Sequence, residues 1–166
     1  MSPDSLANAA QAAVSVTSNI ALYTAWIGMF LMVALSGAGS ALGTVIGGQS
    51  SIAAMKKRDD IFANCMLLSA MPGTQGLYGF GAFFLLKAKI VPGMPMESAV
   101  AILGAGLIVG LVCLLSAIQQ GRVVASGIES IGNGNDVFSK TLVLAVFPEL
   151  YAIISFAAAF LISTGI

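Results

Sequence analysis

The chain has 166 residues, of which 58% are hydrophobic and only 8% charged, and its formal net charge at pH 7 is zero. Such a chain has too few polar side chains to cover a water-facing surface, so the composition excludes an ordinary soluble domain. The balanced charge also argues against binding of nucleic acid, which requires a basic surface. We therefore predict an integral membrane protein in contact with the lipid bilayer.

Four long apolar stretches follow a polar N-terminal segment at residues 1–19. They cover Ile20–Ala54, Ile61–Leu86, Met96–Ile131 and Val137–Ile166. Each is longer than the roughly 20 residues that a membrane-spanning helix requires. Because they are rich in Ala, Leu, Gly and Ile and show no strict alternation, we expect helices and not a lipid-facing β-barrel. The segment 1–19 lacks the basic start of a cleavable signal peptide.

The second half of the chain repeats the first at one constant offset, without a gap. Identical pairs at this offset include Gly28 with Gly104, Ser40 with Ser116, Pro72 with Pro148 and Phe80 with Phe156. Because each unit holds two spans, both units enter the membrane in the same orientation, unlike the inverted repeats of many transporters. We predict an all-α membrane protein with four transmembrane helices, arranged as two tandem parallel-repeat hairpins at residues 20–91 and 92–166.

Most basic residues lie in the connections between the predicted spans. Five of them, Lys56, Lys57, Arg58, Arg122 and Lys140, lie in or near the first and third connections, whereas the second connection has only Lys87 and Lys89. Cytoplasmic connections of membrane proteins carry an excess of Lys and Arg. We therefore expect the first and third connections in the cytoplasm and both termini outside.

Glu149 is the only carboxylate in the stretch 141–166. A charged side chain at the centre of a bilayer costs at least about 2.5–3.5 kcal/mol and usually serves an ion or proton pathway. The offset of the repeat pairs Glu149 with Gly73, so the two hairpins carry a single membrane carboxylate. We expect Glu149 to bind whatever this protein transports.

Polar side chains accompany Glu149 at the same predicted depth. Thr74 and Gln75 follow Pro72 in the second span, and Gln120 lies in the third span. Proline cannot donate a backbone hydrogen bond, which predicts free carbonyls at Leu68 and Leu144. Carboxylate, amide, hydroxyl and carbonyl oxygens suit a hard alkali cation. Alternatively, these side chains only join helices by hydrogen bonds.

Three further features have two interpretations each. Tyr78 either donates its hydroxyl hydrogen to Glu149 or is a packed aromatic side chain. The stripe Gly39, Gly43 and Gly47 allows close helix packing, either within one bundle or in the inner circle of a multi-subunit ring. Cys65 and Cys113 lie in apolar stretches of a chain without histidine, which favours small core residues over a zinc site.

Three segments together resemble the membrane rotor subunit, or proteolipid, of V-type ATPases, in particular the four-helix K subunit of the bacterial type. They are Leu68–Phe80 (LSAMPGTQGLYGF), Ile118–Ile128 (IQQGRVVASGI) and Glu149–Phe156 (ELYAIISF). The resemblance implies a homo-oligomeric ring that turns with a cytoplasmic central-stalk subunit against a stator subunit bearing an essential arginine. It also implies a non-catalytic subunit in a bacterial or archaeal plasma membrane, since vacuolar proteolipids do not usually carry the PGTQGLYG stretch.

The same resemblance assigns roles to individual residues. It implies that Glu149 is the ion-carrying carboxylate and that Tyr78 donates a hydrogen bond to it. The implied Na⁺ ligands are the backbone carbonyl of Met71 and the side chains of Thr74, Gln75, Gln120 and Glu149.

Alternatives remain for both the cargo and the class of protein. A proton needs only Glu149, so the additional oxygen ligands favour Na⁺ over H⁺. A small multidrug antiporter also combines four helices with one membrane glutamate, but it has the acid in its first helix and lacks a tandem repeat. A channel-forming protein with four spans would not need the clustered oxygen ligands.

Overall fold

The computed structural model describes residues 3–166, and all regular secondary structure in them is helical. The elements are α1 (Pro3–Met55), η1 (Asp59–Ile61), α2 (Phe62–Ala70), η2 (Met71–Gly73), α3 (Thr74–Lys87), α4 (Met96–Gly132) and α5 (Phe138–Gly165). This confirms the all-α prediction.

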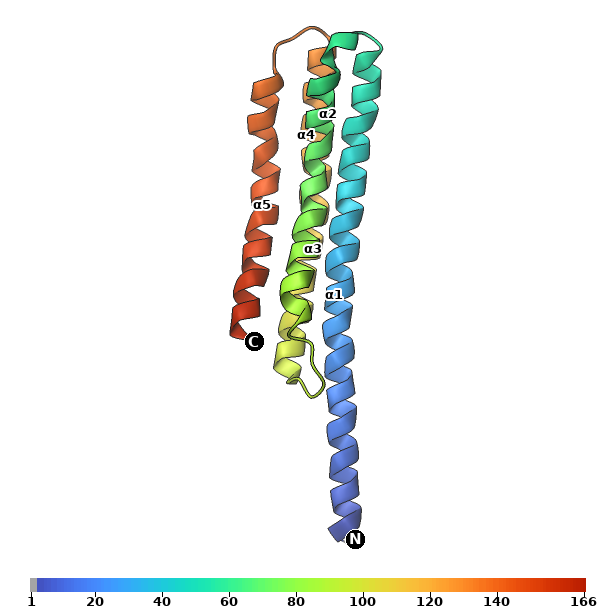
Figure 1. Ribbon diagram of the computed structural model, residues 1–166, viewed down its shortest axis with the longest axis vertical. Helices are drawn as coiled ribbons and strands as arrows, with labels where there is room; N and C mark the ends of the chain where they lie inside the picture. The colour runs from blue at the N-terminus through green and yellow to red at the C-terminus, as the bar shows by residue number, and fades with distance from the viewer. Residues whose placement is uncertain (1–2) are drawn as a thin grey trace.

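The helices lie side by side in an elongated bundle (Figure 1). The connections from α1 to α2 and from α4 to α5 lie at one end, and the connection from α3 to α4 lies toward the other. α1 packs most extensively against α4, and α4 also packs against α5. The N-terminal part of α1 extends well beyond the other helices. Residues 3–19, which the sequence sets apart as polar, are thus the beginning of the same helix.

Within the described residues, three helices are long and apolar enough to cross a membrane: Asp4–Met55, Met96–Gly132 and Phe138–Gly165. The second of the four predicted spans is divided into α2, η2 and α3, which Figure 1 shows as one column. None of these pieces reaches the length of a span, because α2 has 9 residues and α3 has 14. That this column crosses the membrane as a unit remains a prediction.

The division occurs at Pro72 and Gly73, for a local reason. Proline lacks the N–H that an α-helix needs, and glycine is a poor helix former. The Leu68 carbonyl, predicted to be free, instead accepts the N–H of Met71. The N–H of Gly76 donates to the side chain of another helix, Ser40 Oγ of α1, at 2.7 Å.

The equivalent prolines of the two hairpins lie in different secondary structure. Pro148 lies inside the continuous helix α5, whereas Pro72 lies in the 3₁₀ turn η2. Pro148 is followed by Glu149 and Leu150, which are better helix formers than the Gly73 that follows Pro72. The internal repeat is nevertheless visible in the structure. Lys57 and Asn133 occupy equivalent positions in the two hairpins, 76 residues apart, and Lys57 Nζ donates to Asn133 Oδ1 at 2.7 Å.

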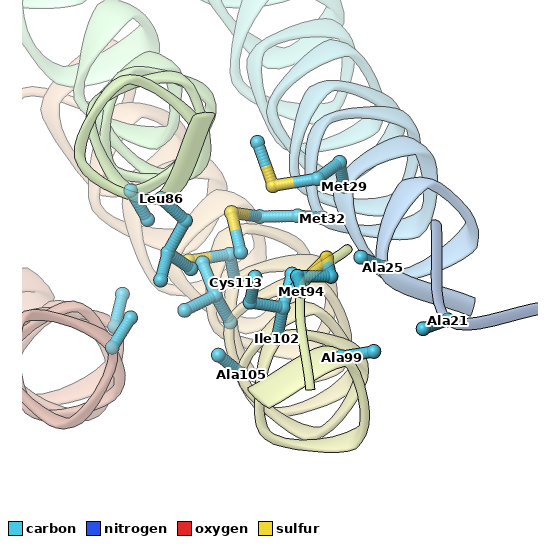
Figure 2. Close-up of a cluster of buried hydrophobic side chains, with 14 residues drawn as sticks. Ala21, Ala25, Met29, Met32, Leu86, Met94, Ala99, Ile102, Ala105 and Cys113 are labelled. Carbon is cyan, nitrogen blue, oxygen red and sulfur yellow. The ribbon is translucent and has the colours of Figure 1, made fainter. Parts of the chain in front are cut away.

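The apolar core forms two clusters separated along the bundle. The larger cluster includes Met29, Met32, Leu86, Ile102 and Cys113, and Figure 2 shows these side chains converging between α1, α3 and α4. The smaller cluster lies toward the η1 end of the bundle and includes Ala54, Ile61, Cys65, Leu68, Val124, Ile128, Ile131 and Ala145. Cys65 and Cys113 are both buried core residues, as predicted.

The glycine stripe of α1 allows close contact inside a single chain. A Cβ atom added to Gly39 would lie 2.5 Å from the Cα of Leu114 in α4, and one added to Gly47 would lie 2.8 Å from the Cα of Ser69 in α2. Packing within one bundle therefore accounts for this stripe.

The outer surface of the bundle carries many large apolar side chains. Phe84 of α3, Tyr151 of α5 and Leu161 of α5 are 68%, 66% and 67% exposed, respectively. A soluble monomer rarely exposes apolar area on this scale, so this surface is suited to lipid or to other subunits.

Candidate functional site

The candidate site lies between the two apolar clusters, where α3, α4 and α5 each contribute polar groups. Along the chain, Gln75 lies between Leu68 of the smaller cluster and Ala82 of the larger one. Gln120 likewise lies between Cys113 of the larger cluster and Val124 of the smaller one. Both glutamine side chains are completely buried. A buried polar group without a partner costs about 1–3 kcal/mol, so these amides must be hydrogen-bonded to be tolerated here.

Glu149 is half-buried and is held by two donors from different helices. Tyr78 Oη of α3 donates to Glu149 Oε1 at 2.8 Å, and Gln120 Nε2 of α4 donates to Glu149 Oε2 at 3.1 Å. Donors directed at both oxygens fix the orientation of the carboxylate between α3 and α4. The structure thus places the Tyr78 hydroxyl on the carboxylate rather than in a purely apolar contact.

The two buried glutamines join α3 to α4 and α4 to α5. Gln75 Nε2 donates to Gln120 Oε1 at 2.8 Å, and Gln120 Nε2 also donates to the carbonyl of Ala145 at 2.9 Å. Gln75 Nε2 additionally donates to Ser116 Oγ at 3.2 Å. No buried side-chain nitrogen or oxygen in residues 3–166 is left without a partner.

The 3₁₀ turn η2 brings Met71 and Thr74 to the same network. Thr74 Oγ1 donates to the Met71 carbonyl at 3.0 Å and lies 3.4 Å from Gln75 Oε1. The five predicted ligand residues therefore form one connected network: Met71, Thr74, Gln75, Gln120 and Glu149.

This network offers one carboxylate together with neutral hydroxyl, amide and carbonyl oxygens. The described part of the chain contains no group of three or more His, Cys, Asp or Glu residues that could hold a metal ion. A cation bound here would therefore rely on one negative charge and on neutral oxygens. Such a ligand set is suited to a hard monovalent cation and unsuited to a soft transition metal.

Sequence reasoning missed three participants in the network: Ser116 and the carbonyls of Pro148 and Ala145. Ser116 Oγ donates to the Pro148 carbonyl at 2.7 Å and accepts from Gln75, and the Ala145 carbonyl accepts from Gln120. Ser116 could have been found from its position, because it lies one helical turn before Gln120 and so on the same helix face. No sequence signal marks the Ala145 carbonyl. The sequence predicts a free carbonyl at Leu68, but this carbonyl accepts the N–H of Met71.

No basic side chain of the described residues is hydrogen-bonded to this network. Arg122 is exposed and donates to Gln119 Oε1 at 3.3 Å, so it takes no part in the site. In the first connection, Arg58 and Asp60 form an exposed ion pair with an N···O distance of 2.6 Å. Hydrogen bonding by the Arg58 guanidinium lowers the pKa of the Asp60 carboxyl.

Comparison with known proteins yields a family match in each hairpin. Residues 27–86 and 103–162 both match the family model that describes the C subunit of ATP synthase. The second match begins and ends at the positions that pair with the first at the offset of the internal repeat. Equivalent stretches of the two hairpins therefore match the same family.

Two individual proteins are similar over most of the chain. The V-type sodium ATPase subunit K of Enterococcus hirae is 33% identical over 147 residues, which cover 89% of this chain and 94% of that protein. The A-type ATP synthase subunit K of Methanocaldococcus jannaschii is 34% identical over 140 residues, which cover 84% of this chain and 61% of that protein.

Proposed function

The chain belongs to the family of ATP synthase C subunits, and from this membership we infer that it is the duplicated membrane rotor subunit, or proteolipid, of a V-type or A-type rotary ATPase. As such it moves ions and is not itself the catalytic subunit. Many copies would form a ring in the membrane. A small multidrug antiporter is set aside, because the family match covers both hairpins.

The transported ion we propose is Na⁺, bound at Glu149. The observation that carries this proposal is the connected set of oxygen-bearing groups from Met71 to Glu149, with a carboxylate that receives two hydrogen bonds. A proton would bind to the carboxylate alone and would leave the buried glutamines without a purpose in transport. The sodium ATPase relative supports the same choice.

The proposed ligands are the Met71 carbonyl, Thr74 Oγ1, the amide oxygens of Gln75 and Gln120, and the Glu149 carboxylate. Tyr78 holds Glu149 in place without binding the ion. These groups come from η2, α3, α4 and α5, so the site forms only when the second half of hairpin one packs against hairpin two.

The mechanism follows from the cost of charge in lipid. An ionised Glu149 facing lipid must be neutralised, and bound Na⁺ does this. When rotation brings Glu149 to the arginine of a stator subunit, that positive charge replaces Na⁺, which leaves through a water-filled path. Each charge moved against 100 mV requires about 2.3 kcal/mol, which ATP hydrolysis in another subunit would supply through the central stalk. The membrane in question would be a bacterial or archaeal plasma membrane.

The test is the rate at which dicyclohexylcarbodiimide modifies Glu149 in the purified ring, titrated with NaCl and with KCl. We expect Na⁺ to slow the modification and K⁺ to have no effect, because a bound Na⁺ prevents protonation of the carboxyl group that reacts. The Glu149→Gln variant gives the background. A modification rate that does not depend on Na⁺ but falls as pH rises would support a proton carrier instead. A complete absence of modification at Glu149 would contradict ion exchange at this residue.

A further inference from the structure

We propose that Ser116 is a positioning residue that determines which end of the Gln75 amide faces the transported cation. This inference rests on the proposed function, since it concerns the same ion site. Ser116 lies in α4, is 6% exposed, and connects Gln75 of α3 with Pro148 of α5.

The direction of the two hydrogen bonds at Ser116 is fixed by chemistry. A serine hydroxyl has one hydrogen and two lone pairs. Its hydrogen is used on the Pro148 carbonyl, which lies at 2.7 Å and can only accept. Toward Gln75, at 3.2 Å, the same oxygen can therefore only accept. Gln75 must present its NH₂ group to Ser116.

This constraint decides where the Gln75 oxygen lies. Both hydrogens of Gln75 Nε2 are used, one on Ser116 Oγ and one on Gln120 Oε1. Gln75 Oε1 consequently lies on the other side, 3.4 Å from Thr74 Oγ1. In the opposite orientation the amide would direct N–H groups at the cation, which repels it. Ser116 thus keeps an oxygen ligand in place without touching the ion.

Gln120 supports the same orientation but is constrained separately. Its own NH₂ group is used on the Ala145 carbonyl and on Glu149 Oε2, which leaves its oxygen to accept from Gln75. Removing Ser116 would therefore remove one of two anchors on Gln75. The expected result is a weakened site, not an abolished one.

The matching serine of the first hairpin has a different partner. Ser40, which pairs with Ser116 in the repeat, accepts the N–H of Gly76 at 2.7 Å and is not hydrogen-bonded to either glutamine side chain. The positioning role therefore belongs to the hairpin that carries Glu149.

The experiment measures the Na⁺ concentration that half-protects Glu149 from dicyclohexylcarbodiimide, in rings purified from the complete complex. Three variants are compared with the unmodified chain. Ser116→Ala removes the hydroxyl. Ser116→Thr keeps it and adds one methyl group, at a position that borders an open groove of about 460 Å³ lined by α4 and α5. Ser155→Ala is the matched control, since Ser155 is 3% exposed and donates to the Ala152 carbonyl away from the glutamines.

We expect Ser116→Ala to raise the half-protecting Na⁺ concentration about tenfold, the effect of losing one buried hydrogen bond. Ser116→Thr and Ser155→Ala should stay within about twofold of the unmodified ring. The rate of modification without Na⁺ should change less than the half-protecting concentration, because neither Ser116 nor Gln75 is hydrogen-bonded directly to Glu149. A general loosening of the ring would change that rate as well.

Two other outcomes separate this inference from the proposed function. If Na⁺ protects the unmodified ring and the Ser116→Ala ring equally, Ser116 has no positioning role while the sodium site stands. If Na⁺ does not protect the unmodified ring, the proposed function itself fails. Should Ser116→Ala rings not assemble, Ser116→Cys takes their place, since a thiol is only a weak acceptor; an unchanged half-protecting concentration would again reject the inference.

Discussion

At the scale of single residues, the polar groups of this protein are arranged by donor and acceptor direction. Gln120 donates to both Glu149 and Ala145, and Gln75 donates to both Gln120 and Ser116. Each buried amide therefore uses both hydrogens of its NH₂ group, and its oxygen also has a partner, since Gln120 Oε1 accepts from Gln75 and Gln75 Oε1 lies 3.4 Å from Thr74 Oγ1. An amide oxygen has two lone pairs, so each can still take a further ligand. In an apolar surrounding this full use of donors stabilises one arrangement over the alternatives, since an unpaired polar group is costly there.

Tyr78 provides the sharpest prediction at this scale. Replacing it with phenylalanine removes the 2.8 Å hydrogen bond to Glu149 Oε1 and leaves the aromatic ring. Hydrogen bonds to charged groups contribute about 1.5–3 kcal/mol, so we expect Tyr78→Phe to raise the half-protecting Na⁺ concentration at least about tenfold. The measurement is the same carbodiimide assay.

Tyr23→Phe is the control for this substitution. Tyr23 is 69% exposed on α1, outside the network. We expect its half-protecting Na⁺ concentration to stay within about twofold of the unmodified ring. An equal effect of the two substitutions would mean that the hydrogen bond from the Tyr78 hydroxyl to Glu149 does not contribute to Na⁺ binding.

At the scale of helices, the bundle depends on close contact between α1 and its neighbours. Where α1 crosses α4, Gly28 lies beside the backbone of Leu103, and Gly39 lies beside the backbone of Leu114. A Cβ at either position would approach backbone atoms, which cannot move aside as a flexible side chain does. Helix association in membranes depends on such close contacts, because lipid supplies little hydrophobic driving force.

Two glycines that lie two residues apart, on different faces of the same helix, test this packing. A Cβ at Gly39 would lie 2.5 Å from the Cα of Leu114, whereas a Cβ at Gly37 would meet no heavy atom within 4 Å. We expect Gly39→Ala to destabilise the bundle by about 1–3 kcal/mol, the usual cost of overpacking. It should accordingly lower the midpoint of heat denaturation of the purified protein in detergent.

Gly37→Ala should leave that midpoint almost unchanged when single chains are compared. If Gly37→Ala lowered it as much as Gly39→Ala, contacts between copies would determine stability at these positions, because alanine is the better helix former and would by itself raise the midpoint. Close packing of α1 on α4 would then not be the reason for the glycines.

At the scale of the whole molecule, the bundle has two chemically different ends. The end with the α1–α2 and α4–α5 connections carries the Lys56–Arg58 run and Lys140, and the opposite end carries Lys87 and Lys89. The excess of basic residues predicts that the first of these ends is cytoplasmic. This orientation would direct the end with η1 toward a central-stalk subunit.

Introduced cysteines test the orientation. Ala88 and Ser139 are exposed residues at opposite ends of the bundle, and the native Cys65 and Cys113 are buried. We expect a membrane-impermeant maleimide to label Ala88→Cys in intact cells. Ser139→Cys should be labelled only in inverted vesicles from which peripheral subunits have been stripped. The reverse pattern would place both termini in the cytoplasm and contradict the predicted orientation.

The sequence by itself determined the features that repeat or that depend on local composition. The apolar stretches predicted the helices, the constant offset between the two halves predicted the duplicated hairpins, and the position of Glu149 indicated the depth of the candidate site. These features are visible in a sequence because hydropathy and helix periodicity involve residues close together in the chain. Residue types at one depth were also sufficient to select Thr74, Gln75 and Gln120 for the oxygen-rich set.

Only the tertiary structure decided which of these groups meet and in which direction they bond. Gln75 reaches Gln120 across 45 residues, and Tyr78 reaches Glu149 across 71. Composition did not reveal that Ser116 lies between Gln75 and Pro148, or that Pro72 divides the second span whereas Pro148 leaves α5 continuous. The reason is physical: which donor meets which acceptor depends on the rotation and axial position of packed helices. Backbone contacts between α1, α3, α4 and α5 set that geometry, and no short stretch of the chain encodes it.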